Sequence, residues 1–262
     1  MRNWFRVLIV GGLTSYRALF NWISPWVFFP HMIGYPVFEI LFFAYLGRFA
    51  EVQSDSFFLI GNAFMGIAVT GFFGMSAAIA GERRSQTLSS LLASPASRMA
   101  LFLGRALPSI VTGFAVAALA FTICALILDV DFTGSELRGL AVAAVVSSFA
   151  CTAFGMCLGA LGLRGRNVTL FADVIAGSML IVSGANVPLE RLPEWVQALS
   201  SVIPLTHGIE AARQLADGAT LSETAGLLAT EAGIGLAYLA AGVVLLRLLE
   251  YEGRRSATLE AF

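Results

Sequence analysis

The sequence contains no lysine and little charge of either sign. All 16 of its basic residues are arginine, and charged residues make up 13% of the 262 positions. Without lysine the chain cannot form a Gly-x-x-x-x-Gly-Lys-Ser/Thr loop around nucleotide phosphates, and it has no amine for a Schiff base. Only two histidines are present, so a His-Glu-x-x-His metal site is excluded and no other metal site is indicated. These absences predict that the chain is not an enzyme.

Long apolar runs are what the sequence has instead. Hydrophobic residues make up 58% of the chain, and runs of about 20 apolar residues can cross roughly 30 Å of hydrocarbon. Six spans are predicted at residues 26–46, 57–80, 106–128, 139–163, 168–187 and 225–246. The expected fold is an all-α integral membrane protein.

The distribution of arginine predicts which side of the membrane each loop faces. With six spans and both termini on one side, that side holds Arg2, Arg6, Arg17, Arg83, Arg84, Arg98, Arg105, Arg164, Arg166, Arg247, Arg254 and Arg255. The opposite side holds only Arg48, Arg138, Arg191 and Arg213. Because arginine and lysine are enriched in cytoplasmic loops, both termini are expected in the cytoplasm.

Residues 1–22 form the first amphipathic segment. Trp4, Leu8 and Tyr16 belong to an apolar face of a helix that carries Arg6 and Arg17 elsewhere. Such a helix suits the membrane interface, with its aromatic side chains inserted and its arginines toward the headgroups. The alternative is a frayed leader to the first span.

The segment 82–98 lies between the second and third predicted spans, on the cytoplasmic side. Leu88, Leu91 and Leu92 follow one another at helical spacing and give a short helix one apolar stripe. Ser94 precedes a proline, which disfavours helical geometry and ends the helix. A short amphipathic helix in this position is well placed to contact a soluble partner.

On the opposite side, residues 188–218 differ from the other loops. Pro193 and Glu194 resemble a helix start, with proline in the first turn and an acid at the positive end of the helix dipole. Pro204 ends the apolar run that follows. Because the stretch is too short to span a membrane, we expect a re-entrant or surface helical hairpin.

Three carboxylates fall within predicted spans. Glu39 lies near the middle of the first span, where an ionised group is costly unless it is paired or faces water. A place in a substrate cavity and a hydrogen-bonded structural role both remain open for it. Asp173 and Glu231 lie near span ends, where structural roles are favoured, for Glu231 solvation or helix capping.

Two motifs carry a resemblance to a known family. The first is Glu82-Arg-x-x-x-Thr87-Leu88-x-x-Leu91-Leu92-x-Ser94-Pro95. The second is Ser183-Gly184…Pro188…Leu192-Pro193-x-Trp195…Pro204-Leu205-Thr206-His207…Arg213. With six spans, they resemble the permease subunits of ABC-2 class ATP-binding-cassette exporters, which include bacterial drug-resistance and nodulation-factor export permeases. Gln86 stands where many members have glycine, and this leaves the subfamily open.

The resemblance implies one ABC-2 type transmembrane domain over residues 1–262, in a bacterial cytoplasmic membrane. Such a subunit pairs with a second permease, identical or homologous, and exports a hydrophobic or amphipathic substrate such as a drug, lipid or glycolipid. Two copies of a cytoplasmic ATPase bind the ATP and Mg, so this chain needs no cofactor of its own. Membrane lipids surround the subunit, and nucleic acid is not an expected partner. The expected docking residues are Glu82, Arg83, Arg84, Thr87, Leu88, Leu91 and Leu92.

Substrate in this family is expected to pass along the subunit interface, near the first, second and fifth spans. Candidate pathway residues are Glu39, Asn62 and Met65, and a candidate extracellular gate comprises Pro204, His207 and Arg213. Two other classes of function stay open on the residues alone. One is an ion-gradient-driven secondary transporter, although no internal repeat is visible, and the other is a membrane anchor without a transport path.

Overall fold

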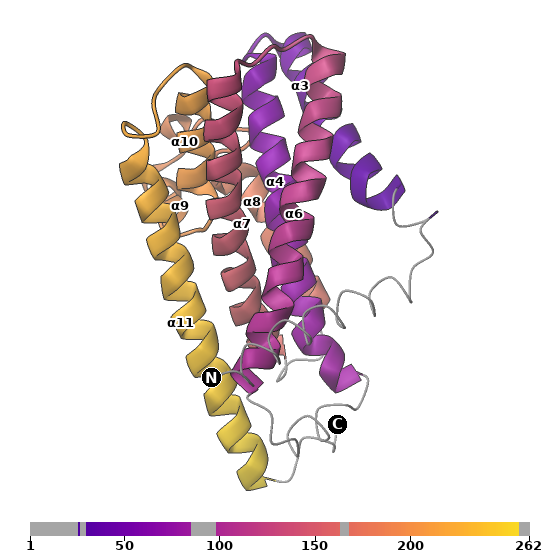
Figure 1. Ribbon diagram of the computed structural model, residues 1–262, viewed down its shortest axis with the longest axis vertical. Helices are drawn as coiled ribbons and strands as arrows, with labels where there is room; N and C mark the ends of the chain where they lie inside the picture. Colours follow the sequence, from indigo (N-terminus) through magenta and orange to yellow (C-terminus); the bar gives the residue numbers. More distant parts are fainter. Residues whose placement is uncertain (1–25, 27–29, 85–97, 163–167, 257–262) are drawn as a thin grey trace.

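The computed structural model describes residue 26 and the ranges 30–84, 98–162 and 168–256. Within these ranges the regular structure is helical, with no strand, which confirms the all-α prediction (Figure 1). The elements are η1 (Pro30–Gly34), α3 (Tyr35–Ala50), α4 (Asp55–Arg84), α6 (Arg98–Leu128), α7 (Gly134–Gly162), α8 (Val168–Val182), η2 (Leu189–Arg191), α9 (Glu194–Ser200), α10 (Thr206–Ala216) and α11 (Ala225–Ser256). The predicted interfacial helix at 1–22 lies outside the described residues.

Five helices among the described residues are long and apolar enough to cross a membrane. Their apolar stretches are Met32–Ala50, Asp55–Ser76, Ala106–Leu128, Gly134–Leu161 and Ala225–Leu248. The chain is therefore a multi-pass membrane protein. The predicted span at 168–187 contains α8, which has only 15 residues and rises about 22 Å at 1.5 Å per residue. Its membrane crossing stays a prediction.

Local sequence explains why two helices, α3 and α8, differ from their predicted bounds. The first span was expected at 26–46, but η1 is a short π-helix and α3 begins at Tyr35 with a proline in its first turn. α8 ends at Val182, five residues before the expected boundary, because the chain turns there. Gly184 in that turn has φ +80°, a conformation that glycine adopts without steric cost.

Helices α4 and α7 form the centre of the bundle. Within an apolar 18-residue stretch of each helix, 72% of the residues in α4 and 67% in α7 are buried, whereas the values for α3, α6 and α11 are 22%, 28% and 17%. α4 packs against α3, α6, α7 and α8, and α7 also packs against α10 and α11. In Figure 1, α6 and α11 accordingly lie on either side of the α4–α7 pair.

The α4–α7 contact is a direct backbone approach. A Cβ atom on Gly155 would lie 2.5 Å from the Cα atom of Phe72, so only glycine fits there. Ser76 of α4 also donates a hydrogen bond to the Gly155 carbonyl at 3.1 Å. Gly155 opens a Gly-x-x-x-Gly pattern, which favours close helix packing in membranes. Here this glycine serves packing within the subunit.

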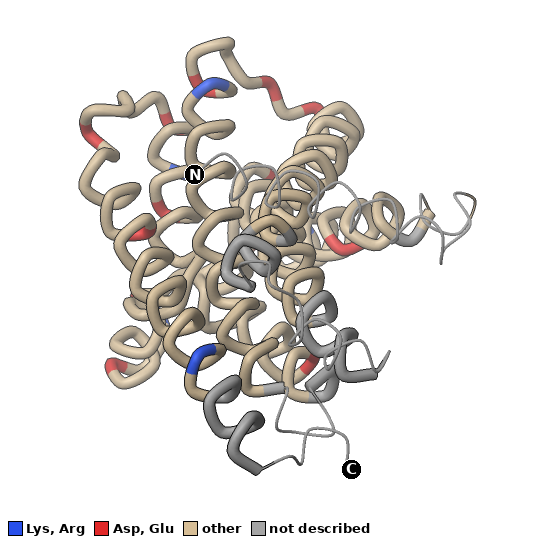
Figure 2. The backbone as a smooth tube through the Cα atoms, turned by 60° about the horizontal axis from the view of Figure 1, so that its bottom comes forward, with Lys and Arg blue, Asp and Glu red and all other residues tan. Residues whose placement is uncertain are grey.

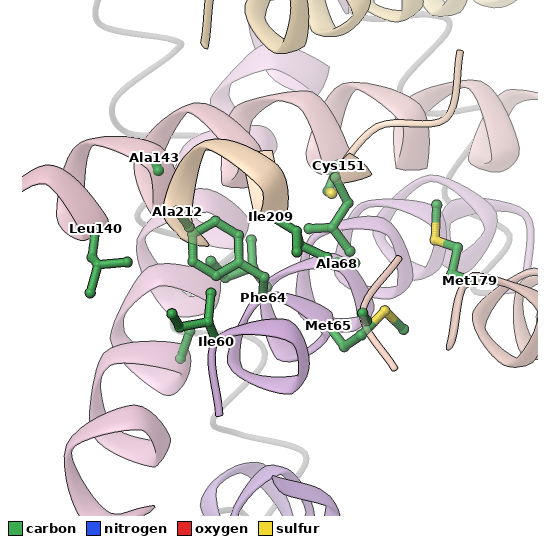
Figure 3. Close-up of a cluster of buried hydrophobic side chains, with 14 of the residues drawn as sticks. Ile60, Phe64, Met65, Ala68, Leu140, Ala143, Cys151, Met179, Ile209 and Ala212 are labelled. Atoms are coloured by element: carbon green, nitrogen blue, oxygen red, sulfur yellow. The ribbon is translucent and has the colours of Figure 1, made fainter. Parts of the chain in front are cut away.

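The main hydrophobic core lies where α10 meets α4 and α7. Figure 3 shows Ile60, Phe64 and Ala68 of α4 beside Ile209 and Ala212 of α10. Also labelled are Met65 of α4, Leu140, Ala143 and Cys151 of α7, and Met179 of α8. A second cluster joins α3, α4 and α6 through Ile40, Ala44, Phe58, Leu59, Ala63, Ala120, Cys124 and Leu128.

The surface of the bundle is apolar along its length. Figure 2 shows that the acidic and basic residues concentrate near helix ends and loops, with long uncharged stretches between them. α3 exposes a row of large side chains, among them Phe38, Phe42 and Phe49. Such a surface is stable against lipid rather than water.

Candidate transport and coupling sites

The segment that follows α8, residues 183–218, folds back onto the bundle and is called the cap segment here. It contains a turn at 183–186, then η2, α9 and α10. α10 packs against α4, α7 and α11. Its buried residues are Thr206, Gly208, Ile209, Ala211, Ala212 and Leu215. α10 is therefore an internal element of the bundle rather than a surface loop.

Arg213, a predicted gate residue in the last turn of α10, joins three elements. Its guanidinium donates hydrogen bonds to the carbonyls of Gly184 and Ala185 at 2.9 Å each, and to the Phe57 carbonyl at 3.3 Å. Its Cζ atom lies 3.5 Å from the centre of the Phe57 ring, a cation–π contact. Arg213 thus connects α10 to the turn after α8 and to the first residues of α4.

The charge of Arg213 matters because the side chain is largely buried. Burial lowers the pKa of the Arg213 guanidinium to about 10, while nearby Glu190, Asp217 and Glu210 act to raise it. At neutral pH the group is therefore still a cation. A cation is favoured beside the carbonyls at the end of α8, because the carboxyl end of a helix carries partial negative charge.

The other two predicted gate residues lie at the start of α10. Pro204 is buried and precedes the helix by two residues. The Nε2 atom of His207 lies 3.0 Å from the Ser201 carbonyl oxygen, so the imidazole bonds local backbone. The structure therefore gathers Pro204, His207 and Arg213 in one short helical unit, and Arg213 donates hydrogen bonds from it to α4 and to the turn after α8.

The first backbone amides of α10 are bound by an acid from another helix. Glu231 of α11 is fully buried. Its carboxylate accepts hydrogen bonds from the backbone N–H of Leu205 at 2.6 Å and of Gly208 at 3.2 Å. Of the two roles expected for Glu231, solvation is ruled out by this burial and helix capping is observed.

Two predicted pathway residues of α4, Asn62 and Met65, are buried against the turn after α8. Asn62 and Asn186 form a reciprocal amide pair, with N···O distances of 2.8 and 3.2 Å. Asn62 also donates to the Phe58 carbonyl at 2.9 Å. Met65 accepts a contact from the Ser183 hydroxyl at 3.7 Å. In this conformation both side chains hold the turn and neither lines an open channel.

The amide pair gives a first testable prediction. Replacing Asn62 with leucine leaves the Asn186 amide only its 3.4 Å hydrogen bond to the Leu180 carbonyl, and we expect the free energy of unfolding to fall by about 1–2 kcal/mol. In the double variant Asn62→Leu/Asn186→Leu, neither amide is orphaned, so the loss should be smaller than the sum of the two single losses. Thermal unfolding in lipid nanodiscs measures this. Gln214→Leu, at an exposed amide of α10, is the matched control, and additive losses contradict the prediction.

Glu39, the third predicted pathway residue, lies on α3 away from the other two. Its Oε2 atom is buried and has no hydrogen-bond partner. The exposed aromatic face of α3, including Phe38 and Phe42, begins beside it. A carboxylate with one unpartnered oxygen, next to an exposed aromatic face, can bind a polar or cationic group of a ligand.

The predicted coupling residues fall mostly outside the described part of the chain. Glu82, Arg83 and Arg84 form the last turn of α4. Thr87, Leu88, Leu91 and Leu92 lie outside the described residues. In Figure 1 the end of α4, the start of α6 and the end of α11 lie at the same end of the bundle, opposite the cap segment.

Comparison with known proteins identifies the family. The sequence pattern of the ABC-2 type transporter family matches residues 12–216, most of the chain. The chain belongs to this family. It is also 26% identical over 140 residues to the "Probable multidrug ABC transporter permease YbhR" of Escherichia coli strain K12, and equally to the protein of that name in Escherichia coli O157:H7. The alignment covers 53% of this chain and 38% of each relative, so the chain spans well under half the length of these curated relatives.

Among the described residues there is no group of three or more His, Cys, Asp or Glu side chains that could hold a metal ion. The three cysteines, Cys124, Cys151 and Cys157, are buried and free.

Sequence reasoning missed two features of the site. Asn186 was not singled out, although the turn sequence Ser183-Gly-Ala-Asn186 places a polar side chain directly after an apolar helix. Glu231 was expected to be solvated or to cap a helix, but the helix that it caps comes earlier in the chain, where Gly208 lies 23 residues before it. No local pattern predicts that contact.

Proposed function

We propose that this chain is the permease subunit of an ATP-driven exporter that moves a hydrophobic or amphipathic substrate across a bacterial cytoplasmic membrane. The observation that carries the proposal is the family match over residues 12–216, together with five described helices long enough to span a membrane. The apolar character of the bundle and the family membership support a drug, lipid or glycolipid as the substrate class.

ATP hydrolysis takes place on a separate subunit in this proposal. The chain has no lysine for a phosphate-binding loop, so a cytoplasmic ABC ATPase, in two copies, binds the ATP and Mg. Thr87, Leu88, Leu91 and Leu92 dock on it, assisted by the charged residues at 82–84. A second permease, identical or homologous, completes the transporter, and both termini of this chain face the cytoplasm.

The substrate pathway of the proposal begins at Glu39 and the aromatic face of α3. Asn62 and Met65 are buried here beneath the turn after α8, so they can meet substrate only when that turn moves away from α4. The hydrogen bonds of Arg213 hold the turn in place. This supports Arg213, with Pro204 and His207 beside it, as part of an extracellular gate that is closed in this conformation.

Reconstitution tests the proposal. The chain, co-purified with its ATPase and inserted in vesicles, should move a fluorescent amphipathic dye only when ATP is added, and ionophores that collapse ion gradients should not prevent this. Transport without ATP that an ionophore abolishes would instead establish a secondary transporter, and absence of any transport supports an anchor. In the same assay Glu39→Gln should shift the dye concentration for half-maximal transport several-fold, whereas Glu51→Gln, at an exposed position after α3, should not.

A further inference from the structure

Helix α10 begins without a capping group of its own. Leu205, the residue before its first turn, offers no side-chain acceptor, and no side-chain cap is formed there. Leu205 also has φ 97°, a conformation that non-glycine residues seldom adopt. The first N–H groups of any helix lack partners within the helix. Those of α10 are buried, since Leu205 is fully buried and Thr206 is only 2% exposed.

Glu231 supplies the missing acceptors from α11. One carboxylate oxygen accepts from the Leu205 N–H at 2.6 Å and the other from the Gly208 N–H at 3.2 Å. A buried carboxylate is costly unless it is hydrogen-bonded. Bonds to backbone N–H groups at the positive end of a helix are the environment that offsets this cost.

The junction around Glu231 brings the start of α10 close to both α7 and α11. A Cβ atom on Gly208 would lie 1.9 Å from the Ser147 hydroxyl oxygen of α7 and 3.7 Å from Cδ of Glu231. α7 and α11 therefore both contact the first turn of α10. Gly208 is the residue that permits this approach.

The far end of α10 belongs to the candidate gate, so the position of the capped first turn also sets the position of the gate residue Arg213. Arg213 lies in the last turn and bonds the turn after α8 and the first residues of α4. We infer that Glu231 is a positioning residue for transport: by capping α10 from α11, it fixes the helix from which Arg213 holds the turn after α8 against α4. This inference rests on the proposed function for its transport consequence, but the positioning itself can be measured separately.

The test uses the whole transporter in lipid nanodiscs, which expose both faces of the membrane. Thr206→Cys places a thiol at the buried first residue of α10, and a membrane-impermeant maleimide reports its exposure. A glutamine at position 231 offers one carbonyl oxygen and directs its amide hydrogens at the second N–H, so Glu231→Gln should raise the labelling rate about tenfold or more. ATP-driven dye transport should fall about tenfold, while the ATPase still co-purifies.

Glu223→Gln is the matched control. Glu223 is an exposed acid of the nearby loop that accepts hydrogen bonds from Thr220, and its replacement should change labelling and transport less than twofold.

If Glu231→Gln fails to accumulate, Glu231→Asp retracts the carboxylate by one methylene and should give intermediate labelling and transport. A wild-type labelling rate in whichever variant accumulates, Glu231→Gln or Glu231→Asp, would overturn the inference that Glu231 positions α10. A raised labelling rate with wild-type transport would overturn the inference that this positioning matters for transport. A wild-type complex that moves no dye refutes the proposed function instead, and the labelling result then stands alone.

Discussion

Replacing Arg213 with leucine is expected to lower the free energy of unfolding by about 3 kcal/mol or more. The substitution removes the donors for the carbonyl oxygens of Gly184 and Ala185, and a further bond to the Phe57 carbonyl, which also accepts a backbone bond within α4. Each buried acceptor left without a partner costs about 1–3 kcal/mol. The cation–π contact with the Phe57 ring is lost as well. Denaturant or thermal unfolding of the purified protein in nanodiscs measures the effect.

Two further variants show whether the geometry of Arg213 or only its charge is responsible. Arg213→Lys keeps the cation but lacks the planar fork that reaches several acceptors at once. Its free energy of unfolding should therefore fall measurably, but by less than that of Arg213→Leu. Arg191→Leu removes an exposed arginine from the same segment and should change stability by less than about 0.5 kcal/mol. Equal losses in Arg213→Leu and Arg191→Leu would show that the buried contacts do not stabilise the protein.

The second large effect concerns the docking segment. Changing Leu91 and Leu92 to aspartate places two carboxylates on the apolar stripe proposed to contact the ATPase. Burying an unpaired charge in an interface costs several kcal/mol, and every 1.4 kcal/mol is a tenfold change in affinity. We therefore expect at least a hundredfold weaker binding of the ATPase and loss of ATP-driven transport. Co-purification and ATP hydrolysis by the complex measure this.

The same segment supplies the control. Ser89→Asp and Ser90→Asp add equal charge within the segment 82–98, off its leucine stripe, and should leave ATPase binding within a few-fold of wild type. Should both pairs weaken binding equally, charge in the segment would be responsible and the stripe would not be the contact.

Apolar periodicity and length were sufficient to predict the long helices. The runs that became α4, α6, α7 and α11 are long and mostly uncharged, and a chain in lipid must satisfy its backbone bonds internally, which favours helices. α8 was harder, because Val187 continues an apolar run by composition while the turn at Gly184 ends the helix earlier. The apolar composition of this run does not indicate where the backbone turns.

Contacts between distant segments account for most of what sequence could not predict at the site. Arg213 was singled out from a motif, but its partners Phe57 and Gly184 lie 156 and 29 residues away. Asn62 was proposed for a substrate pathway, yet its amide pairs with Asn186, 124 residues later. A polar residue in a span indicates that a partner exists, and only the three-dimensional packing identifies it.

The contact between Gly155 and Phe72 limits how the protein can open. Two helices whose backbones touch cannot slide or rotate against each other without steric overlap, so α4 and α7 are expected to move as one rigid body. A conformational cycle must then take place at the periphery, through tilting of α3, α6, α8 or α11 about this central pair. Spin labels on α4 and α7 should accordingly keep a constant separation through the ATP cycle, while a label on α3 changes its distance to both.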